Sequence, residues 1–134
     1  MVYNIRRNGA LGDGKTVNTR IIQNTIDQCH LAGGGTVLIE DGIYVSGTLF
    51  LRSNVILEIS QGAVLKASPD ITDYAENTHH NRYRNEKALD RCFLYGEDQE
   101  NITICGKGRI EGNSEAFPND GSIYRPMLLR FLSC

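Results

Sequence analysis

Hydrophobic positions along the chain follow a helical period up to residue 31 and an alternating period after residue 35. Within residues 18–31, apolar side chains recur at i, i+4 and i+7 on one helical face: Ile22, Ile26 and Cys29, with Leu31 close by. The short polar side chain of Asn18 or Thr16 can accept an unpaired N–H of the first turn, so we expect one of them to cap this helix. The glycines at 33–35 are expected to end it, because glycine takes the left-handed conformation without steric cost.

The second half of the pattern predicts short strands. Apolar and polar positions alternate in runs of a few residues, which is typical of strands with one buried face. These runs cover residues 36–40, 43–45, 48–51, 55–59, 93–95, 102–104, 109–111 and 127–131. No helical pattern separates them, so a doubly wound α/β sheet is excluded and the class is all-β.

The strands repeat along the chain. Asn54 recurs as Asn101 after 47 residues, and Gly62 recurs as Gly108 after 46. Short strands that are turned by Asn and Gly at a fixed period predict a solenoid. Halving the spacing predicts about 23 residues per coil, within the usual range for stacked repeats. The single helix would cover the open end of the first coil.

The pattern divides the chain into two parts. We predict an N-terminal turn and capping helix in residues 1–35, and the first coils of one incomplete domain in residues 36–134. Two polar stretches, residues 69–92 and 113–124, interrupt the strands. A long polar excursion from a rigid solenoid is either a binding loop or a solvated insertion.

The distribution of charge excludes two classes of partner. Acidic and basic residues are spread along the 134 residues and give a net charge of −2, which offers no electrostatic footprint for nucleic acid or an anionic membrane. No apolar run approaches the roughly 20 residues of a membrane-spanning helix. The start of the chain lacks the apolar segment of a signal peptide, so we predict a cytoplasmic location, with a secreted parent protein as the alternative.

Cysteine and histidine do not form a metal-binding pattern. The four cysteines contain no C-x-x-C pair, and we predict that all are buried free thiols: Cys29, Cys92, Cys105 and Cys134. His79 and His80 are adjacent but lack a third ligand. We therefore predict no metal site and no cofactor.

Residues 9–16 match the phosphate-binding pattern G-x-x-x-x-G-K-[ST]. A helix and an apolar strand ending in Glu40 and Asp41 follow, so a nucleotide-binding loop is a real alternative. Against it, residues 3–7 are a poor buried parallel strand, and the helical period starts near Asn18 rather than at the Gly-Lys-Thr. A tight turn before the capping helix is the better interpretation.

These motifs together resemble a known family. The matching residues are 3–5, 9–16, 22–27, 33–37, 42–44, 51–55, 62–65, 101–104, 108–113 and 125–128. They are similar to the opening of the polygalacturonase-type glycoside hydrolases of family 28, which are pectin-lyase-like proteins. The resemblance implies a right-handed single-stranded parallel β-helix with an N-terminal capping α-helix, truncated after the first coils. It also implies hydrolysis of a pectin-like polysaccharide, polygalacturonate or rhamnogalacturonan, with inversion.

The catalytic motifs of that family are missing from this sequence. The family carries its chemistry on Asn-Thr-Asp, Asp-Asp, Gly-His-Gly and Arg-Ile-Lys, whereas residues 109–111 read Arg-Ile-Glu and no Asp-Asp pair occurs. We assign no catalytic residue, and we expect the 134-residue chain to be inactive by itself. A galacturonate polymer is polyanionic and Arg grips carboxylates bidentately, so Arg82, Arg84 and Arg125 are candidate substrate-binding residues, with ordinary surface roles as the alternative.

A second class of function stays open at this point. Other β-helices that act on polysaccharides begin in a similar way, so the chain could be a non-catalytic carbohydrate-binding or tailspike-like module that works as an oligomer. An uncapped last coil near residues 127–131 would expose strand edges and apolar core. We therefore expect association through the C-terminal coil, whichever function is correct.

Overall fold

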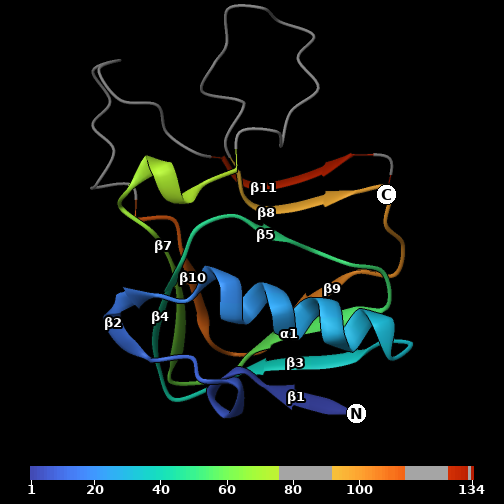
Figure 1. Ribbon diagram of the computed structural model, residues 1–134, viewed down its shortest axis with the longest axis horizontal. Helices are drawn as coiled ribbons and strands as arrows, with labels where there is room; N and C mark the ends of the chain where they lie inside the picture. Colours follow the sequence, from blue (N-terminus) through green and yellow to red (C-terminus); the bar gives the residue numbers. More distant parts are fainter. Residues whose placement is uncertain (76–91, 114–126, 133) are drawn as a thin grey trace, which may run out of the picture.

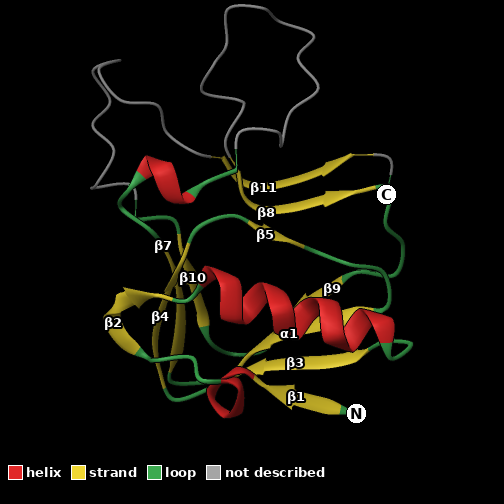
Figure 2. Ribbon diagram, viewed as in Figure 1, coloured by secondary structure: helices red, strands yellow, loops and turns green. Residues whose placement is uncertain are grey.

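The computed structural model describes residues 1–75, 92–113, 127–132 and 134. Eleven described strands form three parallel sheets that run along the molecule (Figures 1 and 2). Sheet A contains β1 (Val2–Asn4), β3 (Gly35–Ile39), β6 (Val55–Ile59) and β9 (Thr103–Cys105). Sheet B contains β2 (Asp13–Val17), β4 (Gly42–Ser46), β7 (Ala63–Ala67) and β10 (Arg109–Glu111). Sheet C contains β5 (Leu49–Phe50), β8 (Cys92–Glu97) and β11 (Met127–Leu132).

Each coil visits the three sheets in the order A, B, C. Strands β3, β4 and β5 make one coil, β6, β7 and β8 the next, and β9, β10 and β11 the last. Every strand pairs in parallel with its equivalents in the neighbouring coils. This arrangement is a parallel β-helix, and it confirms the all-β solenoid predicted from the sequence.

The coil is shorter than the sequence spacing suggested. Leu57 pairs with Val37, 20 residues earlier, and Leu65 pairs with Tyr44, 21 residues earlier. Ile104 pairs directly with Leu57, so the 47-residue spacing is a single coil and not two coils of about 23 residues. The prediction from halving the spacing was wrong, because the segment between β7 and β8 lengthens this coil.

The Asn repeat is a structural stack. The amide of Asn101 donates to Oδ1 of Asn54 at 3.1 Å. Both residues have a positive φ, 57° and 65°, a conformation that Asn tolerates better than most residues. The glycine repeat is out of register by one residue, because Arg109 pairs with Val64, which places position 107 rather than Gly108 over Gly62.

Helix α1 (Thr19–Leu31) takes the place of a sheet-C strand in the first coil, after β1 and β2. Its predicted apolar face is fully buried: Ile22, Ile26 and Cys29. Leu31, in contrast, is 84% exposed. Asn18 occupies the N-cap position but makes no side-chain cap, because its amide pairs with the backbone N–H and C=O of Leu11 at 2.9 Å each. The prediction that the Asn18 side chain caps the helix was therefore wrong.

The first 35 residues do more than form a turn and a helix. Strand β1 pairs with β3 and β2 pairs with β4, and a short 3-10 helix, η1 (Ile5–Asn8), joins β1 to the loop before β2. The strand at Val2–Asn4 lies at the end of sheet A and is exposed at Val2, so it lacks the apolar run by which a buried strand is found.

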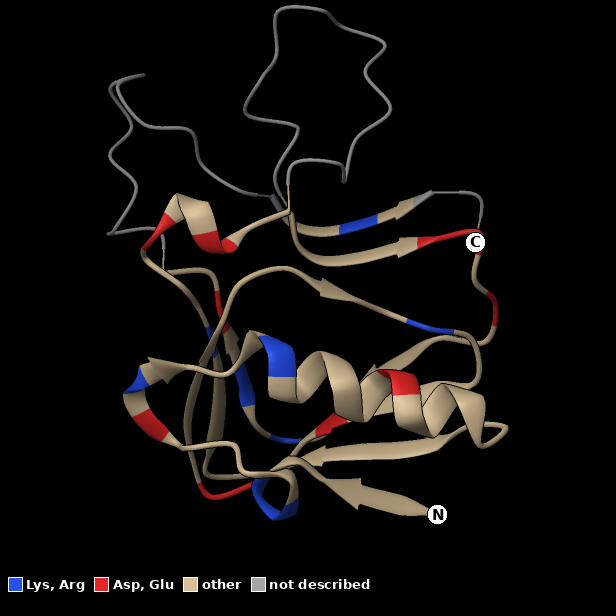
Figure 3. Ribbon diagram, viewed as in Figure 1, with Lys and Arg blue, Asp and Glu red and all other residues tan. Residues whose placement is uncertain are grey.

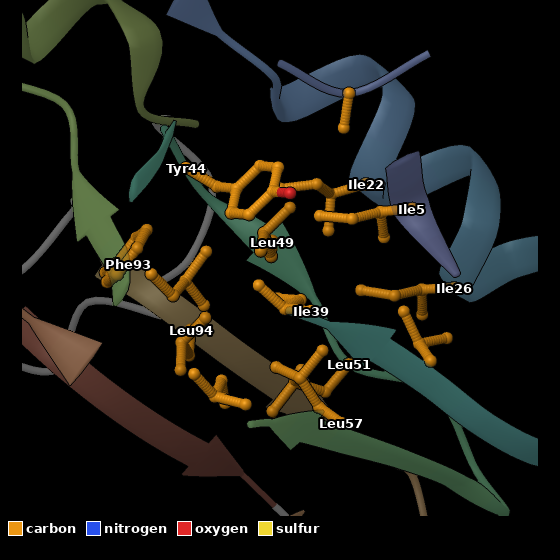
Figure 4. Packing of buried hydrophobic residues seen from close by; sticks show 14 of the residues in the cluster. Ile5, Ile22, Ile26, Ile39, Tyr44, Leu49, Leu51, Leu57, Phe93 and Leu94 are labelled. Atoms are coloured by element: carbon orange, nitrogen blue, oxygen red, sulfur yellow. The ribbon is translucent and has the colours of Figure 1, made fainter. Parts of the chain in front are cut away.

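One hydrophobic core fills the space between the sheets and the helix (Figure 4). Ile22 and Ile26 point from α1 toward Ile39 and Leu49 of the next coil, and Leu57 and Leu94 continue the core into the coil after it. The inward residues stack because strands in successive coils are in register, so each coil buries the apolar side chains of its neighbour.

The helix also supplies hydrogen bonds that a missing strand would have made. Gln23 accepts the N–H of Phe50 in β5 at 2.7 Å and donates to its C=O at 3.0 Å. One helical stripe makes the other contacts to this edge: Asp27 with Arg52, and His30, which donates from Nδ1 to the carbonyl of Ser53 at 2.9 Å. The helix therefore covers the core and satisfies the strand edge together.

Candidate functional site

Long connections occur at only one corner of the described solenoid. Sheet A joins sheet B through residues 40–41, 60–62 and 106–108, and sheet C joins sheet A through residues 51–54 and 98–102. Sheet B joins sheet C through residues 47–48, 68–91 and 112–126 in successive coils. Insertions in a solenoid that gather on one face often mark its binding face. We call this edge the B–C corner.

The first part of the 68–91 connection packs tightly onto the corner. It contains the 3-10 helix η2 (Ile71–Asp73), whose N-cap Asp70 accepts the Thr72 N–H at 2.9 Å. The hydroxyl and the N–H of Thr72 both donate to Asp70 and lower the pKa of its carboxyl. Next along the chain, Tyr74 is buried against Phe93 with ring centroids 6.5 Å apart, and burial raises the pKa of its phenol.

Thr48 holds both ends of that connection. Its hydroxyl accepts the N–H of Ala75 at 2.9 Å and donates to the C=O of Cys92 at 2.6 Å. Thr48 is 4% exposed, so both bonds lie in a dry environment. The two ends of the longest connection are therefore fixed to the preceding coil by one side chain.

Gly47, beside Thr48, lets η2 approach the corner. A Cβ at this position would lie 1.9 Å from the carbonyl oxygen of Asp73, so no other residue fits without displacing η2. The Gly47 N–H is bonded to Oγ1 of Thr19 in α1 at 2.7 Å. The corner thus joins α1, the first full coil and η2 in one packed arrangement.

An open hollow of about 490 Å³ lies between these three elements. Helix α1 contributes Thr19, Arg20, Gln23 and Asn24, β5 and the residue before it contribute Phe50 and Thr48, and the η2 region contributes Thr72, Asp73, Tyr74 and Ala75. The first turn of α1 carries the basic residue Arg20, and η2 carries Asp73 with Asp70 as its N-cap; Figure 3 colours basic and acidic segments on these two elements. The hollow combines a half-buried aromatic ring with hydrogen-bonding groups, as sites for polar organic ligands do.

A smaller hollow of about 270 Å³ lies on the outer face of sheet C. The rings of Phe50 and Tyr95 meet edge to face at 5.8 Å, and the guanidinium of Arg52 lies 5.8 Å from the Phe50 ring centroid. Burial raises the pKa of Tyr95 to about 12. Because Tyr95 is only 2% exposed, this hollow offers a ligand little aromatic surface.

In the segment that resembles a phosphate-binding loop, the amides of Lys15 and Thr16 are already hydrogen-bonded. The Thr16 hydroxyl and the N–H groups of Thr16 and Lys15 all donate to the carboxylate of Asp13, which holds its pKa at about 2. Residues 13–17 form strand β2, and the helix begins only at Thr19. The structure therefore shows neither a phosphate-binding loop nor a tight turn directly before the helix, because strand β2, with a register shift between Asp13 and Val17, lies there.

The strand acids Glu58 and Glu111 do not form a pair. Glu58 lies between Leu38 and Cys105 in sheet A, whereas Glu111 lies in sheet B with its carboxylate 4.0 Å from Nζ of Lys66. Among the described residues, no three His, Cys, Asp or Glu side chains gather to hold a metal ion.

The comparisons with known proteins agree with this architecture. Over 119 residues, 84% of its length, the chain is 35% identical to the exo-poly-alpha-D-galacturonosidase of Dickeya chrysanthemi. The structure of the family 28 exopolygalacturonase of Yersinia enterocolitica superposes with a TM-score of 0.72 and 34% identity over 84% of the chain. Over most of its length, the chain is thus homologous to polygalacturonases.

The match to the polygalacturonase family covers only part of its members. The chain spans 19% of the Dickeya protein and 21% of the Yersinia structure, about a fifth of each. A shorter stretch of 65 residues, 42% of the chain, is 45% identical to alginate lyase 7 of Azotobacter vinelandii and spans 8% of it. No protein-family model matches the chain.

The three predicted substrate-binding arginines, Arg82, Arg84 and Arg125, lie outside the described residues. Their sequence positions fall in the two long connections of the B–C corner, and their role stays a prediction. None of the described helices is long and apolar enough to cross a membrane.

Sequence reasoning missed Thr48 and Arg20. Thr48 begins the predicted strand at residues 48–51, where the alternating pattern carries no functional signal, and its two partners are distant in sequence. Arg20 lies outside the apolar positions of the helix, so the hydrophobic pattern gives no signal for it. The cysteines also differ from the prediction, because Cys29 and Cys92 are buried but Cys105 and Cys134 are exposed.

Proposed function

We propose that this chain is the cap and first coils of a polygalacturonase-type glycoside hydrolase that acts on a polyuronate, with pectin-like polygalacturonate as the substrate. The observation that carries the proposal is the 35% identity to an exo-poly-alpha-D-galacturonosidase over cap and coils together. The alginate lyase match supports the broader class, because alginate is also a polymer of uronic acids. Polygalacturonate and alginate are both polyanionic chains.

The B–C corner is the part of the solenoid that we propose faces the polymer. All three long or variable connections there follow one another along the solenoid axis, which suits an extended chain lying across several coils. The candidate arginines fall in the two longest of them. Arg pairs bidentately with carboxylates, so these connections are well suited to a polyuronate.

We propose hydrolysis with inversion, by carboxylates that this chain does not supply. An inverting enzyme needs an acid and a base about 6.5–9.5 Å apart. Coils lie about 4.8 Å apart and alternate strand residues about 6.7 Å apart, so diagonal positions on adjacent coils give about 8 Å. The scaffold can present such a pair, but Glu58 and Glu111 lie in different sheets. The 134-residue chain is therefore expected to bind without cleaving.

A non-catalytic carbohydrate-binding module is the second candidate. The observation that favours it is the absence of the family's Asn-Thr-Asp, Asp-Asp and Gly-His-Gly motifs from these 134 residues. Such a module would bind the same polymer at the same corner. The two candidates differ in whether a longer protein containing these residues cleaves it.

The proposal is tested with the purified chain and polygalacturonate. We expect retarded migration of the chain in gels that contain polygalacturonate, with no new reducing ends and no unsaturated product. Alginate in place of polygalacturonate tests the broader polyuronate class. Release of reducing ends would contradict the expectation that this chain does not supply the catalytic carboxylates. An unsaturated product would indicate a lyase. Failure to bind either polymer would contradict the proposed function.

A further inference from the structure

The hollow between α1, β5 and η2 lies at the end of the B–C corner nearest the cap. We propose that it is a binding site for a single uronic-acid unit, with Arg20 holding the carboxylate. The inference rests on the proposed function and extends the contact surface of the polymer from the coils to the capping helix.

Two side chains of the hollow are available to a ligand. Within the described part of the chain, Arg20 makes no ion pair and Asn24 makes no side-chain hydrogen bond, and both are exposed. Gln23 is not available, since its amide is bonded to the backbone of Phe50. The hollow thus offers one cation and one amide on successive turns of the same helix face.

The walls of the hollow are rigid. Thr48 is bonded on two sides, and Gly47 packs against η2 so closely that a Cβ would lie 1.9 Å from the Asp73 carbonyl oxygen. Tyr74 is buried and donates to the carbonyl of Ser68 at 2.7 Å. A preformed wall lowers the ordering cost of binding.

Size and polarity match a sugar acid. The volume of about 490 Å³ is within the usual range for small-ligand sites. The half-buried ring of Phe50 can face the apolar side of a sugar ring, while Asn24 and Thr72 can serve its hydroxyls. Carboxylate recognition by Arg makes the site selective for an acidic sugar.

The charges around the hollow favour an anion beside α1 and not beside η2. The positive end of the α1 dipole adds to Arg20, and no acidic residue lies in the first turn. Asp73 faces the hollow from η2, with one carboxylate oxygen hydrogen-bonded to Ser68 Oγ at 2.5 Å. A bound carboxylate is therefore expected beside α1, with hydroxyls toward Asp73.

The test is titration of the chain with tri-galacturonate and with its methyl ester, in which each carboxylate loses its charge and carries a methyl group. We expect amide shifts at residues 19–24 and 72–75, and Arg20→Gln to weaken tri-galacturonate binding about tenfold, the loss of one charge-assisted hydrogen bond. Arg7→Gln removes the same charge from an exposed site outside the hollow and should leave affinity unchanged.

The outcomes separate this inference from the proposed function. If the chain binds polygalacturonate but Arg20→Gln binds tri-galacturonate as the wild type does, the inference fails and the proposed function stands. Equal affinity for trimer and ester also overturns it. If the wild type binds neither polymer nor trimer, both fail.

Discussion

The two ends of this solenoid differ in how far their apolar core and strand edges are covered. At the N-terminal end, α1 buries Ile22, Ile26 and Cys29 completely over the first full coil. At the other end, β9, β10 and β11 pair on one side only within the described sheets. Large apolar side chains remain in solvent there: Leu128 at 42%, Leu129 at 41% and Phe131 at 45% exposure.

The difference shows that a cap has two roles: it covers the apolar core, and it pairs the backbone groups of the strand edge. Gln23 and His30 also occupy the backbone groups of the strand edge and the following turn, which would otherwise be free to pair with another chain. The last coil has open strand edges as well as exposed apolar surface. Association through that coil stays a prediction, and the four changes below test the contrast between the ends.

The largest expected effect is a cavity beneath the cap. Ile26→Ala should lower the free energy of unfolding by about 2–5 kcal/mol, because Ile26 is fully buried between α1 and the first coil. Leu129→Ala at the open end should cost less than about 1 kcal/mol, since its side chain is partly in water. Urea midpoints at constant m measure both. Equal losses would mean that the ends are equally packed.

A smaller loss is expected from crowding the corner that the cap shares with η2. Gly47→Ala forces a methyl group against the Asp73 carbonyl and should cost about 1–3 kcal/mol. Gly112→Ala at the same corner of the last coil meets nothing closer than 3.7 Å and should be within about 0.5 kcal/mol of wild type. Thermal unfolding of the two variants side by side gives the comparison. A neutral Gly47→Ala would show that η2 does not pack where it is placed.

Removing the side-chain amide of Gln23 tests whether α1 stabilises the strand edge through hydrogen bonds. Gln23→Met keeps the length of the side chain but leaves the N–H and C=O of Phe50 unpaired, which should cost about 1–3 kcal/mol. Gln28→Met, at an exposed position of the same helix, should be near neutral. Light scattering of the Gln23 variant should also show more association. If the two variants have the same stability, the helix acts only as an apolar cover.

The smallest perturbation is thiol labelling, which leaves the fold intact. Cys105 and Cys134 are exposed near the open end and should react quickly with iodoacetamide at pH 8. Burial raises the pKa of Cys29 and that of Cys92, the latter to about 12, so both should stay unmodified until the chain unfolds. Mass spectrometry of the digested protein identifies each thiol. Protection of Cys105 that is lost on dilution would show association through the last coil.

The fold could be predicted because its signals are local. The helical period of Ile22, Ile26 and Cys29 and the alternation around Leu57 reflect which side chains face the core. The coil length could not be predicted, because the Asn54 to Asn101 spacing contains an insertion that sequence alone cannot tell from a second coil. Asn18 was assigned a capping role because its competing partner, Leu11, is brought close only by the tertiary turn.

The corner was predictable in outline and not in its residues. Two polar stretches indicated where connections leave the solenoid, and both are in the B–C corner. The role of Thr48 depends on Ala75 and Cys92 meeting it from both ends of a long connection, which no periodicity encodes. The cytoplasmic location stays a prediction.

Amide hydrogen exchange with and without oligogalacturonate shows whether a polyuronate lies along the B–C corner. We expect slower exchange at residues 47–48, 71–75 and 92–93 in the complex, with no change at residues 40–41 and 60–62 of the opposite A–B corner. Protection at the A–B corner, or protection spread evenly over all three corners, would contradict it.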